Sequence, residues 1–220
     1  MKLTMLGTGN ALVTECYNTC FVVQNGKKHL LVDGGGGNTL LAQLKHAGFN
    51  WMDMREIFVT HKHVDHLMGI VWMIRMICQY MRQGQYQGEA WIYGHDEVIA
   101  ILKEMADRLL SGKETCFIGN RLHMEVVGDG EERTLIGKKV TFLILAPPKR
   151  SSTDSAWIWE MEKSLPAVGT SPTMSVKETM QKTANGSFMR LFVFMIRQRS
   201  FILMKSITPR RKMPVSWQKV

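Results

Sequence analysis

Long apolar runs are missing from this chain of 220 residues. No run reaches the ~18 apolar residues that a membrane-spanning helix needs, so we expect no membrane partner. The beginning of the chain does not combine a basic region, an apolar stretch and a small-residue cleavage site, which predicts no secretory signal peptide. The four cysteines fit neither a disulfide framework nor a C-x-x-C zinc site. These absences favour a cytoplasmic protein whose cysteines are reduced and structural.

Metal-binding residue types are instead concentrated in one stretch, Thr60–Gly69. Three histidines and one aspartate fall within six of its residues, directly after the apolar run 57–59, which is typical of a short buried strand. A helix is predicted over 67–80, so the stretch forms a strand-to-helix turn. Solvent-exposed loop histidines are the alternative interpretation, and the density of four such residues disfavours it.

The spacing within this stretch predicts two clusters of donors. His61 and His63 are two residues apart, so an extended backbone directs both imidazoles to the same side. Asp65 and His66 enter the predicted helix and can turn toward a second point close by. Imidazole together with carboxylate is a donor set that zinc or a similar metal prefers.

The pattern Thr-His-x-His-x-Asp-His, with a glycine three residues further on, resembles the metallo-β-lactamase superfamily and in particular its ribonuclease Z-like branch. The resemblance implies a hydrolase with two zinc ions, with manganese as an alternative metal. His61 and His63 would bind the first metal, and Asp65 and His66 the second. Asp65 would also be the catalytic residue that orients the attacking water and acts as its general base.

Asp33 precedes a run of four glycines at the end of a predicted hairpin that turns on Asn25-Gly26. This run is not a Walker loop, because the Lys-Ser/Thr that grips phosphate and magnesium is absent. Composition alone indicates a flexible turn. The resemblance implies more, because strand-Asp-Gly matches the family's first motif, whose aspartate supports the metal ligands from behind. Asp33 is the expected supporting residue.

Strands and helices alternate through residues 1–142, which favours an α/β layer fold. The resemblance implies part of a metallo-β-lactamase-like αββα sandwich, with the metal site at one edge of its two sheets. Toward the end of this part, two strands are predicted at 121–127 and 139–142, joined by Gly128–Gly130. His95 lies between a predicted strand and helix, where a structural role is favoured and a ligand role is the alternative. His123 is expected to be structural.

Residues 143–220 differ in character from the first part. Residues 1–142 hold 15 Lys and Arg against 15 Asp and Glu, whereas the remaining 78 hold 13 against 4. His123 is the last histidine, and Asp154 is the one aspartate of the tail. The resemblance implies a third histidine, a bridging aspartate and a final histidine after the first motif, and no residue of the tail takes these roles. We therefore expect an incomplete sandwich with an irregular, poorly ordered basic tail.

A shifted reading frame explains the missing motifs. Reading the codons of 166–175 from the third base allows Cys-Cys-Gly-Asp-Glu-Pro-Tyr-Asn-Glu. The same shift allows Leu-Leu-His-Glu-Ala-Phe at 186–192 and Pro-Tyr-Glu-Lys-His-His-Ser-Thr at 202–210. These sequences resemble the absent Asp motif and final His motif, in family order. A chance match allowed by codon degeneracy is the alternative, and three matches in one frame disfavour it. We therefore hypothesise that the tail is the out-of-frame product of a ribonuclease Z-like gene, and an in-frame DNA read across this region would refute that.

Three functional expectations follow. The resemblance to the branch implies cleavage of RNA, such as the 3′ ends of precursor tRNA, by a protein that can form a homodimer. A hydrolase of cyclic nucleotides or other small phosphodiesters is the enzymatic alternative. The third expectation is a catalytically inactive remnant that binds metal weakly. A basic tail that contacts RNA or a membrane surface is the alternative to a frameshift.

Overall fold

The computed structural model describes residues 1–145 and 156–161 of the chain. A six-stranded sheet has the order β1-β2-β3-β4-β5-β6, and a three-stranded sheet has the order β7-β8-β9. The strands of the first sheet are β1 (Lys2–Gly7), β2 (Cys20–Asn25), β3 (Lys28–Val32), β4 (Glu56–Phe58), β5 (Ala90–Gly94) and β6 (Leu122–Val126). The helices are α1 (Thr39–His46), α2 (Val64–Arg82), α3 (Asp96–Leu109) and α4 (Gly112–Thr115), with a 3-10 turn at Trp51–Asp53.

The first sheet brings the polar ends of several strands to one edge. β2 and β3 form the predicted hairpin, with Asn25 opposite Lys28 and Gly26 at a φ of 60° in the turn. From β3 onward the strands β3, β4, β5 and β6 run parallel. Residues that follow these strands therefore gather at the same edge, the usual location of a site in such sheets.

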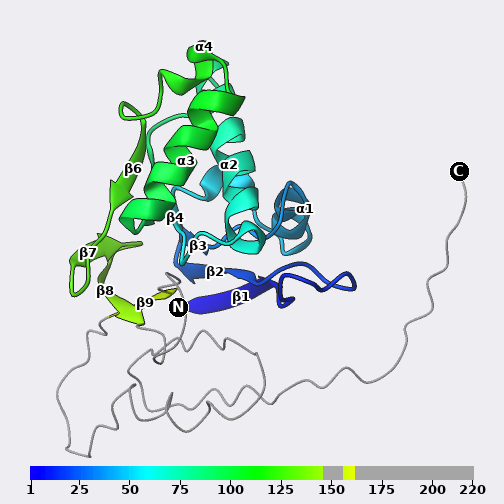
Figure 1. Cartoon of the computed structure of the whole chain (residues 1–220), viewed down its shortest axis with the longest axis vertical. Coiled ribbons are helices and arrows are strands. Elements are labelled where there is room, and N and C mark those ends of the chain that lie inside the picture. Colours follow the sequence, from blue (N-terminus) through cyan, green and yellow to red (C-terminus); the bar gives the residue numbers. More distant parts are fainter. Residues whose placement is uncertain (146–155, 162–220) are drawn as a thin grey trace, which may run out of the picture.

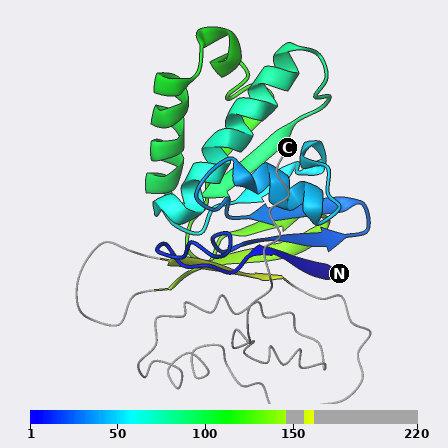
Figure 2. The same ribbon diagram turned by 90° about the vertical axis from the view of Figure 1, so that its right-hand side faces the viewer.

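The helices cover one face of the first sheet (Figures 1 and 2). α2 begins at Val64, inside the histidine-rich stretch, and its buried side includes Ile70, Ile74 and Ile77. These side chains join one apolar core with Leu31 and other residues from the helical face of the sheet. The predicted helix over 67–80 is confirmed and is longer at both ends.

The second sheet lies against the other face of the first (Figure 2). It contains β7 (Glu132–Leu135), β8 (Lys138–Leu145) and β9 (Ala156–Met161), which pair antiparallel. Side chains such as Val32 and Phe58 from the first sheet pack with Val140 and Phe142 from the second. The prediction that strands 121–127 and 139–142 are joined directly was wrong, because β7 intervenes and the two strands belong to different sheets.

These layers are helices, sheet and sheet, three of the four layers of an αββα sandwich. A second helical layer is not found among residues 1–145 and 156–161. Of the tail that was expected to be irregular, 143–220, the structure describes the end of β8 and the strand β9, which pair in the second sheet. The other residues of the tail lie outside the described part of the chain. No helix in the described part of the chain is both long and apolar enough to span a bilayer.

Candidate metal centre

The candidate site is built where β3 and β4 end side by side. The backbone N–H of Asp33, directly after β3, donates to the carbonyl of Phe58 over 2.9 Å, which continues the parallel pairing by one residue. Thr60 and His61 follow β4, and His63 occupies the position before the first residue of α2. The predicted strand-to-helix turn is therefore confirmed, and it faces Asp33 across the strand ends.

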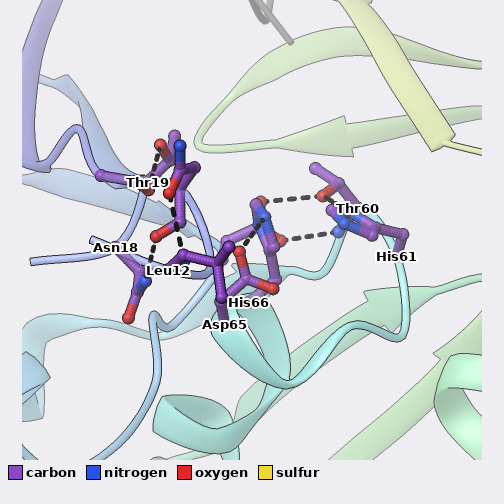
Figure 3. A network of polar contacts seen from close by, with 10 residues as sticks. Leu12, Asn18, Thr19, Thr60, His61, Asp65 and His66 are labelled. Carbon is purple, nitrogen blue, oxygen red and sulfur yellow. Dashed lines mark hydrogen bonds and ion pairs between the residues drawn. The ribbon is translucent and has the colours of Figure 1, made fainter. Parts of the chain in front are cut away.

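Asp33 is the centre of a buried hydrogen-bond network. Its partners Thr60 and His66 are labelled in Figure 3. Its side chain is 1% exposed and its backbone has a φ of 59°, in the left-handed region that aspartate tolerates better than most residues. One carboxylate oxygen accepts from the Thr60 backbone N–H over 2.8 Å. The other accepts from the Thr60 hydroxyl over 2.8 Å and lies 2.8 Å from His66 Nδ1. Hydrogen bonds from donors of this kind compensate a buried carboxylate for the loss of its hydration.

This network selects the tautomer of two histidine rings. His66 Nδ1 faces the Asp33 carboxylate, so Nδ1 carries a proton, and in the neutral ring Nε2 then carries the lone pair. The Thr60 hydroxyl donates a hydrogen bond to the Asp33 carboxylate. The hydroxyl oxygen of Thr60 therefore accepts a hydrogen bond from His61 Nδ1 over 2.9 Å. His61 Nε2 then also carries the lone pair. Both rings are held in the form that binds a metal through Nε2.

Asp65 and His66 lie together in the first turn of α2, both almost fully buried. An Asp65 carboxylate oxygen is 3.4 Å from His66 Nε2. Two donors about 2.0–2.2 Å from a tetrahedral zinc ion are about 3.3–3.6 Å apart, so this separation suits a shared ion.

The other histidines of the motif complete a compact cluster. The His61 ring centroid is 4.0 Å from that of His66 and 4.7 Å from that of His63. As they stand, no three His, Cys, Asp or Glu side chains in the described part of the chain form a group that could hold a metal ion. The chemistry of the donors and their protonation fit zinc, while their convergence is incomplete.

The structure also places His95 and His123, the two other histidines weighed from the sequence. His95 follows β5 at the same sheet edge and occupies the N-cap position of α3. It is 8% exposed, and its Nδ1 lies 3.4 Å from a carboxylate oxygen of Asp96. His123 lies on β6, stacks on Trp91 and contacts Glu89 over 2.9 Å, as expected of a structural residue.

Comparison with known proteins fits this arrangement. A family model described as Anti-Pycsar protein Apyc1 matches residues 1–114, just over half of the chain. The chain belongs to the Apyc1 family. The match covers Asp33 and the whole histidine-rich motif.

Curated relatives of the Apyc1-family chain carry two different names. Ribonuclease Z of Methanosarcina mazei is 36% identical over 75 residues, which are 34% of this chain and 24% of that protein. Anti-Pycsar protein Apyc1 of Bacillus phage vB_BveM-Goe7 is 39% identical over 71 residues, 31% of this chain and 26% of that protein. The matched segment thus spans about a quarter of the length of each relative.

Solved structures similar to this Apyc1-family chain establish its fold. The metallo-β-lactamase fold protein YhfI from Bacillus subtilis has a TM-score of 0.55 at 18% identity, covering 73% of this chain and 58% of that one. The short form of human tRNase Z has a TM-score of 0.52 at 16% identity, covering 74% and 64%. The chain has the metallo-β-lactamase fold, as the resemblance of its motif implied.

The structure places all five predicted site residues around the ends of β3 and β4, in pairwise contacts, and adds Thr60 to them. The sequence placed Thr60 in the motif without assigning it a role. Its hydroxyl links Asp33 to His61, and this link depends on the pairing of β3 with β4. The spacing of residues along the chain gives no signal for it.

Proposed function

We propose that this chain derives from a metal-dependent phosphodiester hydrolase. The observation that carries the proposal is the Asp33 network, which holds His61 and His66 in the form that offers Nε2 to a metal. In metal enzymes, a buried carboxylate of this kind fixes the tautomer and the orientation of the imidazoles that bind the metal. Ribonuclease Z, the name of several curated relatives, is also the name of an enzyme that cleaves RNA, which is a phosphodiester.

The residue roles are those that the resemblance of the motif implies. His61 and His63 would hold a first zinc ion, and Asp65 and His66 a second. When bound, zinc would supply a water acidic enough to be a nucleophile near neutral pH, with a pKa of about 7. Asp65, whose carboxylate lies beside His66 Nε2, would be the residue that orients this water and takes up its proton. Asp33 and Thr60 hold the imidazoles in place.

RNA is the substrate class that the ribonuclease Z relatives favour. Five of the seven curated relatives are named Ribonuclease Z. The proposed reaction is hydrolysis of a phosphodiester near the 3′ end of an RNA such as precursor tRNA, in the cytoplasm. The cysteines agree with a reducing compartment, since all four are free thiols.

A small phosphodiester is the second candidate substrate. The family that matches the chain carries a description other than ribonuclease Z, so RNA is not the one substrate class to test. A cyclic nucleotide would need the same metal-activated water and the same general base. The two substrate classes differ in size and not in the chemistry of cleavage.

An assay with both classes tests this function. The substrates are a precursor tRNA with a 3′ trailer and a panel of cyclic mononucleotides, each with zinc or manganese. We expect no appreciable turnover by the 220-residue chain, which lacks three ligands of the family site. A chain with its reading frame restored should cleave one class, and Asp65→Asn in that chain should abolish cleavage. Cleavage of neither class by the restored chain would defeat both assignments.

A further inference from the structure

Tyr17, between β1 and β2, reaches the glycine loop that follows Asp33. Its hydroxyl oxygen lies 2.8 Å from the Gly34 carbonyl and 2.7 Å from the Gly37 carbonyl. The backbone N–H of Gly37 donates to the same oxygen over 3.3 Å. Burial raises the pKa of Tyr17 to about 12, so the hydroxyl keeps the proton that it donates at any physiological pH. One phenol therefore joins both ends of the loop 34–37.

The Tyr17 ring also fits against the middle of this loop. A Cβ at Gly35 would lie 2.3 Å from Tyr17 Cε1, and Gly35 has a φ of 68°. Glycine is thus required at Gly35 both by its backbone conformation and by the ring. The loop has no room to shift toward Tyr17.

The opposite side of the loop is bonded to the helix that carries two proposed ligands. The Gly34 N–H donates to the His66 carbonyl over 2.7 Å, and the Gly69 N–H donates to the Gly35 carbonyl over 2.9 Å. A Cβ at Gly69 would lie 1.8 Å from the Gly34 oxygen, so loop and helix are in direct backbone contact. A single layer of peptide groups separates the Tyr17 phenol from the first turns of α2.

We propose that Tyr17 is a positioning residue for the metal centre. Its hydroxyl fixes the loop 34–37, and the loop in turn fixes the turn of α2 that presents Asp65 and His66 to a metal. The role belongs to the hydroxyl, because the ring alone would lack the hydroxyl that contacts the Gly34 carbonyl and would leave the Gly37 carbonyl with the Leu40 N–H at 3.2 Å. This inference rests on the proposed metal site and adds a residue outside both sequence motifs.

Metal binding by the 220-residue chain tests the proposal. Zinc affinity is measured by competition with a chromophoric chelator, and Co²⁺ absorption reports the geometry around the ion. We expect Tyr17→Phe to weaken zinc binding about tenfold, the low end of the loss caused by removing a group that supports a ligand. The Co²⁺ spectrum should change as well. Tyr80→Phe is the matched control, since it removes a phenol from α2 that makes no contact with the loop, and its zinc affinity should equal that of wild type.

Comparison with the wild-type chain separates the possible failures. Loss of the fold in Tyr17→Phe, or zinc affinity and a Co²⁺ spectrum equal to wild type, would overturn the positioning role. Zinc binding by the wild-type chain that survives His61→Ala/His63→Ala would instead refute the proposed metal site. A modest loss of stability alone does not lower zinc affinity while the folded state predominates, so the affinity reports on position.

Discussion

At the scale of single residues, Asp33 determines the chemistry of the candidate site. It adopts a left-handed backbone, and such a conformation in a residue other than glycine is costly unless its surroundings hold it. The three hydrogen bonds to its carboxylate supply that support and orient two imidazoles. The same bonds that stabilise Asp33 therefore prepare the metal ligands.

Asp33→Asn is expected to weaken zinc binding by about 10–100-fold, the usual loss when a group that orients a ligand is removed. An amide has one accepting oxygen, so its NH₂ group must face either the Thr60 backbone N–H or both the Thr60 hydroxyl and His66 Nδ1. Chelator competition measures the change, with Asp107→Asn on the exposed side of α3 as a control that should bind zinc like wild type. Equal zinc affinity of the Asp33 variant and wild type would remove Asp33 from the site.

Glu56 offers a pH-dependent prediction at the same scale. Burial raises its pKa above the ordinary 4.5, although the bond from the Ile136 N–H and the charge of Lys28 act in the other direction. The folded state therefore holds the Glu56 proton more tightly than the unfolded state does. It follows that the free energy of unfolding falls as the pH rises from the unfolded pKa through the folded one.

Glu56→Gln keeps the shape of the side chain and removes this titration. We expect the variant and wild type to have similar unfolding free energies near pH 4, and the variant to be the more stable of the two near pH 7. Urea denaturation at both pH values measures the difference between them. A difference that does not grow with pH would show that burial of the Glu56 charge carries no cost.

At the scale of elements, the contact between α2 and the glycine loop decides where the ligands lie. Gly69 lies inside α2, where alanine normally stabilises by about 0.5–1 kcal/mol. Here a Cβ would meet the Gly34 carbonyl oxygen at 1.8 Å, and both partners are backbone. Gly69→Ala should therefore lower the free energy of unfolding, whereas the same substitution inside a helix usually raises it.

Gly69→Ala is expected to destabilise the fold by about 1–3 kcal/mol, the cost of overpacking, as measured by urea denaturation. Gly37→Ala is the matched control from the same loop, because nothing lies within 4 Å of its added Cβ. The control should stay within about 0.5 kcal/mol of wild type. A stabilising Gly69→Ala would mean that α2 does not rest on the loop.

The elements also show what the sequence could predict. The β2–β3 hairpin follows from Asn25-Gly26, and the strand-to-helix turn follows from an apolar run before the histidines. The sequence did not predict the strand β7, because its residues Glu132 to Thr134 are exposed and only Leu135 is buried. Its turn to β8 uses Ile136 at a φ of 46° followed by Gly137 at 74°, and isoleucine is not a residue that predicts such a turn.

Distant contacts explain why Ile136 tolerates that conformation. Its N–H donates to the Glu56 carboxylate over 2.6 Å, and its carbonyl accepts from the Asn25 side chain over 3.0 Å. Its side chain is fully buried between the sheets. Tertiary structure thus overrides a local preference at Ile136. The roles of Thr60 and Tyr17 also depend on distant contacts, with residues 27 and 17 positions away.

At the scale of the whole molecule, the N-terminal part and the tail require different accounts. Residues 1–142 form the helical layer, the first sheet and two apolar cores, one on each face of that sheet. We propose that residues 143–220 are read out of frame, because their charge balance and lack of histidine depart from the first part and one shift yields sequences that resemble the missing Asp motif and final His motif. The 220-residue chain then holds the first half of a dinuclear site.

Zinc binding by the 220-residue chain tests this account most directly. Equilibrium dialysis with metal analysis gives the number of ions bound and their affinity, with His61→Ala/His63→Ala as the test variant and His123→Ala as the control. We predict binding far weaker than that of a complete zinc site, lost in the double variant and kept in the control. Two tightly bound zinc ions per chain, or binding that does not depend on His61 and His63, would contradict it.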